Sequence, residues 1–274
     1  MEYLFQLTSG ADRMYLHPAC LKNSLLHKRA SSMKILVLTY LLLVLFPPLI
    51  FATPSNIIRI PSGDVQPFGT FRLGIDNNTT LFVPPKSGGA ALPVTYGLTA
   101  GTYDAVVLQT EIGVDIKEVS KDPAYFNVKF VSPEGSINDL MPALFFGGYD
   151  FGLRLESTDY NIVYGGFAKT FSFIGRFTGG YFIGNKNLLK DRNGKSDNQG
   201  IMLGFDRRMP DVNEKLWFGI DYMATNSLYG ALSFGFAWSF SEAATLTLAY
   251  IRYNDEVISP TKSNLVSWQV DFDF

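Results

Sequence analysis

The sequence predicts an all-β chain of about twelve antiparallel strands. Two observations carry this prediction: apolar and polar residues alternate along one segment after another, and connections rich in Gly, Pro and polar residues separate the segments. Side chains along a strand point alternately to its two faces, so alternation marks a strand with one apolar and one polar face. The segments have roughly the nine to eleven residues of a tilted membrane-crossing strand. No helical heptad and no fixed repeat interrupts them.

A secretory signal peptide is predicted over residues 33–52. Its start is basic, its centre is apolar, and it ends on the small residue Ala52, where cleavage fits. A membrane-spanning helix is the alternative, because the apolar run is nearly long enough to cross a bilayer. Pro47 and Pro48 would remove backbone hydrogen bonds from such a helix and kink it, which favours the signal peptide.

The segments on either side of the signal peptide are expected to have little regular structure. Met33 is a natural start for the signal peptide, so residues 1–32 are predicted to be a non-structural upstream extension. Residues 53–66 form a short polar lead with two prolines and Gly63. We expect this lead to lie at the mouth of the domain that follows.

Six strands are predicted in the first half of the remaining chain. In the first, Phe71 and Leu73 alternate with Arg72, and the clearest alternation places Glu111 and Asp115 on one polar face. The residues between the first two strands are rich in Asn, Thr, Pro and Gly and are predicted to form a loop, 77–93. The six predicted strands are 68–76, 94–101, 108–117, 126–130, 143–151 and 162–170.

One strand of this half, 143–151, contains several aromatic residues. We predict that Phe145, Tyr149 and Phe151 point outward. Gly148 and Asp150 would then point inward.

Six further strands are predicted in the second half. A charged loop, 185–198, interrupts them, and a long alternating segment ends on Trp238 and Phe240. The predicted strands are 175–184, 201–206, 216–222, 228–240, 245–253 and 264–274.

The last strand has the most informative pattern. Trp268, Val270, Phe272 and Phe274 share one face, and the residues between them are polar or acidic. A final amphipathic strand that closes on a terminal Phe resembles the C-terminal signature of bacterial outer-membrane β-barrel proteins, of a small porin-like or uncharacterised type. In that family the strand seals the barrel against the first strand and is read by the insertion machinery.

This resemblance implies a transmembrane, antiparallel, up-and-down β-barrel over residues 67–274, located in the bacterial outer membrane. The implied partners are outer-membrane lipid and the barrel insertion machinery, with Trp268, Val270, Phe272 and Phe274 as the assembly signal. With an even number of strands and a periplasmic C-terminus, residues 53–66 become a periplasmic lead. The two longest loops, 77–93 and 185–198, then fall on the outer side, as such barrels require.

A soluble β-sandwich is the alternative fold, because its strands show the same alternation. The terminal Phe, the strand lengths and the aromatic residues near strand ends favour the membrane barrel. These aromatic residues are Tyr222, Trp238, Phe240, Tyr250 and Trp268.

Composition excludes several functions. Residues 53–274 contain no His and no Cys, which removes disulfides, thiolate chemistry, imidazole bases and the commonest zinc ligands. The same residues include 18 basic and 23 acidic ones, so no nucleic-acid surface is indicated. Glu111 and Asp115 would be about 13 Å apart along one strand, too far for a retaining carboxylate pair. We therefore predict no enzyme, no cofactor and no metal.

Charged residues of both signs are predicted to line the lumen. An unpaired cluster of one sign would favour a small passive channel for ions or small polar solutes, which is the first functional hypothesis. Closely matched ion pairs would favour a non-conducting structural or accessory barrel, which is the second hypothesis. Residues 142–152 and 164–169 resemble strand pairs of outer-membrane barrels associated with exopolysaccharides, so this hypothesis includes a link to envelope exopolysaccharide export. The lumen-facing candidates are Arg72, Asp76, Glu111, Asp115, Lys117, Lys129, Asp150, Arg154, Lys169, Arg176, Asp206 and Asp221.

Overall fold

The computed structural model describes residues 55–80, 83–117 and 124–274. The predicted upstream extension, the signal peptide and residues 53–54 of the lead lie outside the described residues. Among the residues that are described, no helix has the length and apolar character needed to cross a membrane.

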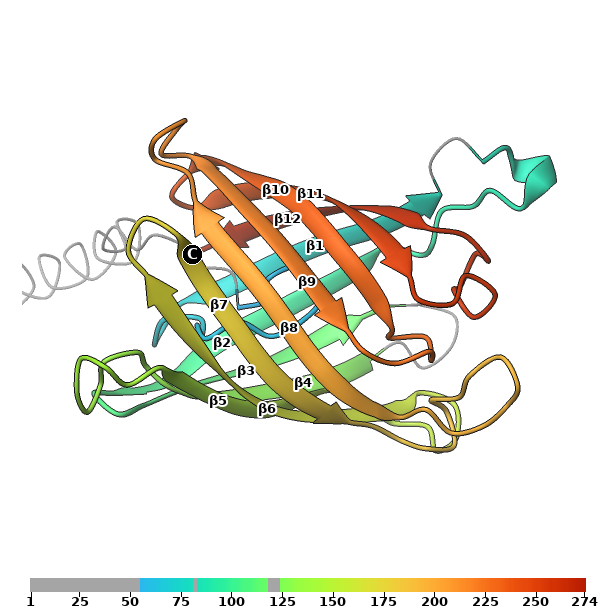
Figure 1. Cartoon of the computed structure of the whole chain (residues 1–274), viewed down its shortest axis with the longest axis horizontal. Helices are drawn as coiled ribbons and strands as arrows, with labels where there is room; N and C mark the ends of the chain where they lie inside the picture. The colour runs from blue at the N-terminus through green and yellow to red at the C-terminus, as the bar shows by residue number, and fades with distance from the viewer. Residues whose placement is uncertain (1–54, 81–82, 118–123) are drawn as a thin grey trace, which may run out of the picture. The chain divides into compact units, whose positions relative to one another are not determined.

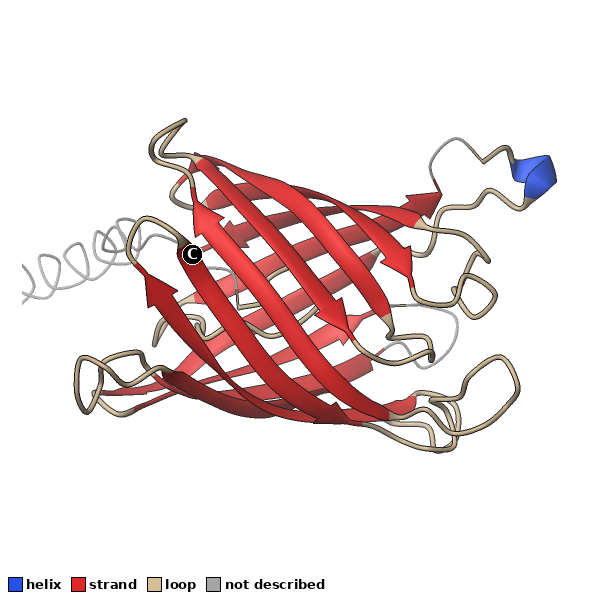
Figure 2. Cartoon of the chain, in the orientation of Figure 1, coloured by secondary structure: helices blue, strands red, loops and turns tan. Residues whose placement is uncertain are grey.

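The described part of the chain forms twelve antiparallel strands that close into one barrel (Figures 1 and 2). The strands follow one another around the barrel in chain order, and β12 pairs with β1 to close it. The predicted all-β, antiparallel, up-and-down barrel is therefore confirmed. The strands are β1 (Phe71–Thr80), β2 (Thr95–Ala105), β3 (Leu108–Ile116), β4 (Ala124–Ser132), β5 (Ala143–Gly152), β6 (Asp159–Phe171), β7 (Gly175–Ile183), β8 (Gln199–Arg208), β9 (Leu216–Met223), β10 (Ala231–Ser241), β11 (Ala244–Tyr253) and β12 (Leu265–Asp273).

The two ends of the barrel differ. At one end, here called the turn end, β2–β3, β6–β7 and β10–β11 are joined by tight connections, and the C-terminus lies at this end in Figure 1. The opposite end, called the loop end, carries the longer connections 81–94, 184–198 and 254–264. The first of these contains the short 3-10 helix η1 (Pro85–Ser87), and β1 itself runs farther into this connection than its sequence pattern predicts.

The terminal residue takes part in closing the barrel. The backbone N–H of Phe71 donates to the carbonyl of Phe274 at 2.8 Å, and the N–H of Phe274 donates back at 2.9 Å. Their rings stack with centroids 5.9 Å apart. Along the same seam Leu73 faces Phe272, so the apolar faces of β1 and β12 form one continuous outer surface.

Large apolar side chains cover the outer face of the barrel. Phe146 is 58% exposed, Phe240 is 60% exposed and Leu203 is 53% exposed. Monomeric proteins in water rarely expose contiguous apolar surface on this scale, so this face requires an apolar environment.

The inner face of the barrel carries both charged and large apolar side chains. Strands β1, β3 and β4 contribute Arg72, Asp76, Glu111, Asp115 and Lys129, whereas the large apolar side chains of the inner face, such as Phe145, Ile162, Phe182 and Met202, come from β5 to β11. These apolar residues form a packed core inside the barrel.

The predicted faces of strand 143–151 were wrong for three residues. Phe145 is only 2% exposed and lies inside, as does Tyr149, while the intervening Gly148 is on the outward face. The reason is a β-bulge: the register shifts between Tyr149 and Phe151, and Asp150 between them has a φ of 57°. Because of the extra residue, the side chains of both Tyr149 and Asp150 point into the barrel. Strict alternation counted backward from the inward Asp150 therefore places the earlier residues of the strand on the wrong face.

Candidate functional site in the barrel lumen

Residues 55–66 occupy the lumen and make a tight hairpin there. Asn56 and Pro61 form an antiparallel bridge. The N–H of Ile57 donates to the carbonyl of Ile60 at 2.9 Å, and the N–H of Ser62 donates to the carbonyl of Ser55 at 3.0 Å. The tip of this lumen hairpin consists of Ile58 and Arg59, whose own N–H groups need partners outside the hairpin.

One carboxylate of the barrel wall supplies those partners. Asp221 Oδ2 on β9 accepts the N–H groups of Ile58, Arg59 and Ile60 at 2.8, 2.6 and 3.2 Å. Asp221 is 2% exposed, so all three bonds are shielded from water. Hydrogen bonds to a charged acceptor are about twice as strong as neutral ones, which makes Asp221 the main polar anchor of the hairpin tip.

Apolar packing fixes the rest of the hairpin. Ile57 and Ile60 are 3% and 1% exposed, and both belong to the core inside the barrel. A Cβ built on Gly204 of β8 would lie 2.5 Å from Ile57 Cδ1, so the missing side chain at Gly204 makes room for the hairpin. Gly63 has the same role on the hairpin side, where an added Cβ would lie 2.9 Å from the Cβ of Ala168.

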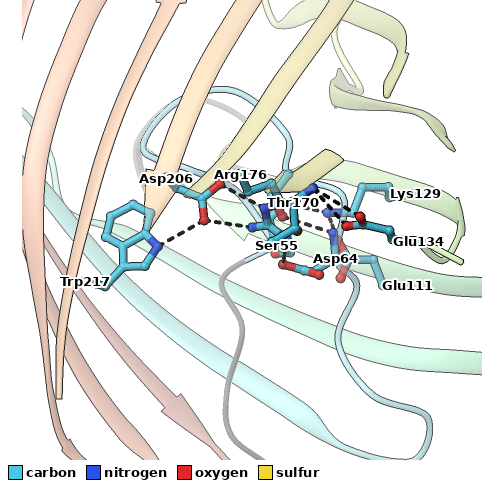
Figure 3. Close-up of polar contacts among 10 residues, drawn as sticks. Ser55, Asp64, Glu111, Lys129, Glu134, Thr170, Arg176, Asp206 and Trp217 are labelled. Atoms are coloured by element: carbon cyan, nitrogen blue, oxygen red, sulfur yellow. Dashed lines mark hydrogen bonds and ion pairs between the residues drawn. The ribbon is translucent and has the colours of Figure 1, made fainter. Parts of the chain in front are cut away.

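Ion pairs join the hairpin to the wall near the turn end (Figure 3). Arg176 forms a two-bond pair with Asp206, with Nε and Nη2 at 2.9 and 3.0 Å from the carboxylate oxygens, and its Nη1 bonds Asp64 of the hairpin. Trp217 Nε1 donates to Asp206 at 3.2 Å.

A second ion pair faces this one across the hairpin. Lys129 Nζ lies 3.3 Å from Glu111 Oε1 and also donates to the carbonyl of Ser55. Glu111 Oε2 accepts the backbone N–H of Gln66 at 2.6 Å. Each charged group of the pair therefore contacts both the wall and the hairpin, as Figure 3 shows for Lys129, Glu111 and Ser55.

The structure brings most of the predicted lumen residues together and leaves two elsewhere. The residues on the inner face are Arg72, Asp76, Glu111, Asp115, Lys117, Lys129, Asp150, Arg176, Asp206 and Asp221.

The prediction was wrong for Lys169 and Arg154. Lys169 lies opposite the exposed Phe177 on the outward face of β6, where it pairs with Glu134 at 3.0 Å. The strand that contains Lys169 starts three residues earlier than predicted. It has a glycine on each face, so the alternation of apolar and polar residues along it is weak. Arg154 is exposed in the connection after β5, because that strand ends at Gly152.

Several residues that complete the lumen were not predicted from the sequence. Arg59 and Asp64 belong to a segment without alternation, and Tyr164 and Tyr229 look like ordinary apolar positions. The short Ile-Ile-Arg-Ile run at 57–60, unusual in a polar lead, was the available signal.

The predicted assembly residues occupy one face of the last strand. Trp268, Val270 and Phe272 share the outward face of β12, and Phe274 contacts Phe71 at the seam. No described residues form a group of three or more His, Cys, Asp or Glu with a geometry suited to a metal ion.

A separate ion pair joins two connections at the loop end. Arg192 of the 184–198 loop donates through Nε and Nη2 to the carboxylate of Asp255 in the 254–264 loop. These hydrogen bonds and the positive charge lower the pKa of Asp255 below its ordinary value. The pair holds two otherwise separate loops together.

Comparisons with known proteins identify little beyond the fold. No family model and no curated protein matches the chain. Among solved structures, it is similar to a multiply substituted mutant of the Rh. blastica porin, with 11% identity and a TM-score of 0.36. The match covers 66% of this chain and 55% of the porin chain, so the chain spans about half the length of that protein. The closed antiparallel barrel of this chain is established by its own strand order.

Proposed function

We propose that this protein is an outer-membrane β-barrel whose lumen is closed by its own N-terminal hairpin, so that it is not an open passive pore. The observation that carries the proposal is the position of residues 55–66, which lie inside the barrel and are bound by Asp221, Glu111 and Arg176. A closed barrel satisfies all backbone groups in a membrane, and the apolar outer face described above matches lipid. The turn end then faces the periplasm.

Four ion pairs in the lumen support the closed state, whereas Asp76 and Asp115, which have no ion pair among the described residues, do not. Arg72 pairs with Asp273, Lys117 with Asp150, and the two pairs that contact the hairpin are described above. Matched pairs of this kind were the feature expected of a non-conducting barrel. The packed apolar core on β5 to β11 supports the same conclusion, because Ile57 and Ile60 of the hairpin pack against it.

A passive channel is the second candidate, and one observation favours it. The hairpin is held inside the barrel by side-chain contacts and is not a strand of the sheet. Its withdrawal would uncover the charged inner wall of β1 to β4 without breaking the strand ladder. In this form of the proposal the protein conducts small solutes only after the hairpin leaves.

No catalytic step is part of the proposal. Glu111 is engaged by Lys129 and by the N–H of Gln66, so its carboxylate is not a free base. Any role in exopolysaccharide export would use the outer loops and the periplasmic end.

Single-channel recording in planar bilayers tests the proposal. The full-length protein, purified from membranes, is compared with a variant that lacks residues 55–66. We expect the native protein to insert without conductance steps and the deletion variant to give discrete steps. Stable open steps from the native protein would contradict the closed-lumen proposal.

A further inference from the structure

A polar cavity lies beside the tip of the lumen hairpin, toward the loop end. Its volume is about 310 Å³, similar to about ten water molecules at roughly 30 Å³ each. We call it the tip cavity. The side chains that the argument uses are Arg59, Asp76, Asp115, Lys117, Tyr229 and Tyr253.

Two cations that line the tip cavity, Arg59 and Lys117, each lie over a tyrosine ring. The Arg59 guanidinium lies 5.3 Å from the ring centroid of Tyr253, and Lys117 Nζ lies 4.7 Å from that of Tyr125. Both distances are within the range of a cation–π contact. Arg59 Nη1 is buried without a hydrogen-bond partner among the described residues, so this guanidinium is held mainly by its ring contact and by the backbone of the hairpin tip.

Two carboxylates of the tip cavity remain without an ion pair in the described part of the chain. Lys117 forms an ion pair with Asp150, whereas no Lys or Arg among the described residues lies within salt-bridge distance of Asp76 or Asp115. Asp115 accepts a 3.3 Å hydrogen bond from Asn127. Gly97 leaves space for it, since a Cβ there would lie 2.7 Å from Asp115 Oδ1.

We propose that the tip cavity binds a small organic cation of the guanidinium or ammonium class, in a position that the chain's own Arg59 now partly fills. Carboxylates on β1 and β3 supply the negative charge, and the tyrosine rings supply the faces on which such a cation rests. A metal ion is a poorer occupant, because Asp76 and Asp115 are the only unpaired described carboxylates in the cavity and no third one joins them. This inference does not depend on whether the lumen ever conducts.

The proposal predicts competition between a bound cation and Arg59. The Arg59 guanidinium lies over a tyrosine ring and brings a positive charge into the cavity. Replacing it therefore frees that ring face and makes the net charge of the cavity more negative. Arg59→Gln should therefore bind an external cation more tightly than the native protein does. Removing the charge of Asp76 or Asp115 should weaken binding.

Isothermal titration calorimetry with agmatine, which has one guanidinium and one ammonium group, tests this proposal. The full-length protein is used at low salt in a maltoside detergent, since a choline-containing detergent would itself supply a competing cation. We expect Arg59→Gln to tighten binding about tenfold, and Asp76→Asn combined with Asp115→Asn to weaken it at least tenfold. Hexane-1,6-diol, an uncharged probe of similar length, should not bind.

Asp271→Asn is the matched control, because it removes one carboxylate from the inner face of β12 outside the tip cavity. Thermal unfolding of every variant establishes that each barrel is folded. Agmatine binding that survives Asp271→Asn and is lost in the double variant supports the site. Absence of binding to both the native protein and Arg59→Gln overturns the proposal, as does an equal loss in Asp271→Asn.

Discussion

Replacing Asp221 by Ala should release the tip of the lumen hairpin. The carboxylate accepts three backbone N–H groups, and each hydrogen bond to a charged group contributes about 1.5–3 kcal/mol. The variant would thus lose roughly 4–9 kcal/mol of hairpin binding. Alanine also removes the cost of keeping a charge buried, so we expect the lower end of this range.

The apolar contacts of the hairpin oppose its release. Burial of Ile57, Ile58 and Ile60 contributes about 1.5–3 kcal/mol for each side chain, and Asp221→Ala leaves these contacts intact. The hairpin should therefore still occupy the lumen most of the time, but the fraction of released molecules should rise. A loss of about 4 kcal/mol of binding free energy raises the equilibrium constant for hairpin release roughly a thousandfold, because each 1.4 kcal/mol corresponds to a factor of ten.

Cysteine labelling measures that fraction. Ser62 is fully buried in the hairpin, and Cys20 is the only cysteine of the chain, so Ser62→Cys in a Cys20→Ser background gives one reporter thiol. The rate of its reaction with a charged maleimide should rise by orders of magnitude in Asp221→Ala. Asp221→Asn keeps one acceptor oxygen and should give an intermediate rate.

Ser233→Ala is the control for this experiment. Ser233 is fully buried directly opposite Asp221 in the β9–β10 pair, so Ser233→Ala changes the surroundings of the Asp221 carboxylate and leaves its three bonds to the hairpin N–H groups in place. Its substitution should leave labelling slow. Equal protection of the thiol in the native protein and in Asp221→Ala would refute the role assigned to Asp221.

Three further predictions concern packing, closure and the outer loops. Gly204→Val should lower the melting temperature, at a cost of about 1–3 kcal/mol of overpacking against the hairpin, and thermal unfolding in detergent checks this. Phe274→Ser removes the ring that stacks on Phe71 and should reduce the heat-modifiable, folded band on electrophoresis, whereas Phe274→Tyr should preserve it. The pKa of Asp255 is lower in the folded protein than its ordinary value, so its ion pair with Arg192 stabilises the two loops fully at pH values above the ordinary carboxyl pKa. This stabilisation is lost as the pH falls through the lowered pKa. Protease cleavage of the loop ends should accelerate below about pH 4, and Asp255→Asn should cleave rapidly at neutral pH as well.

The barrel was largely predictable because alternation is a local property. Strands β8, β9 and β12 each place apolar residues on one face without interruption, so their faces follow directly from the sequence. Strand β5 shows the limit of this reasoning, because one inserted residue at Asp150 reverses the assignment of everything before it.

The state of the lumen was not predictable, because it depends on contacts between residues far apart in the chain. Asp221 was identified as a lumen charge, but its three partners lie more than 160 residues earlier, in a segment with no strand pattern. The pairing of Arg176 with both Asp206 and Asp64 likewise requires the hairpin to be in place. The sequence therefore indicated which side chains face inward and left open whether they surround water or a packed segment.

Disulfide trapping of the hairpin against the wall is the most direct test of the closed lumen. Ile57→Cys and Gly204→Cys place two thiols close together, because a Cβ at Gly204 would lie 2.5 Å from Ile57 Cδ1. In a Cys20→Ser background, mild oxidation of the protein in membranes isolated from the expressing cells should link them, and mass spectrometry should detect the linked peptides. The matched pair Ile57→Cys and Leu203→Cys should not link, because Leu203 is exposed on the outer face of the same strand. Efficient trapping of the first pair alone is the predicted result. Two free thiols in both pairs would contradict the presence of the hairpin in the lumen.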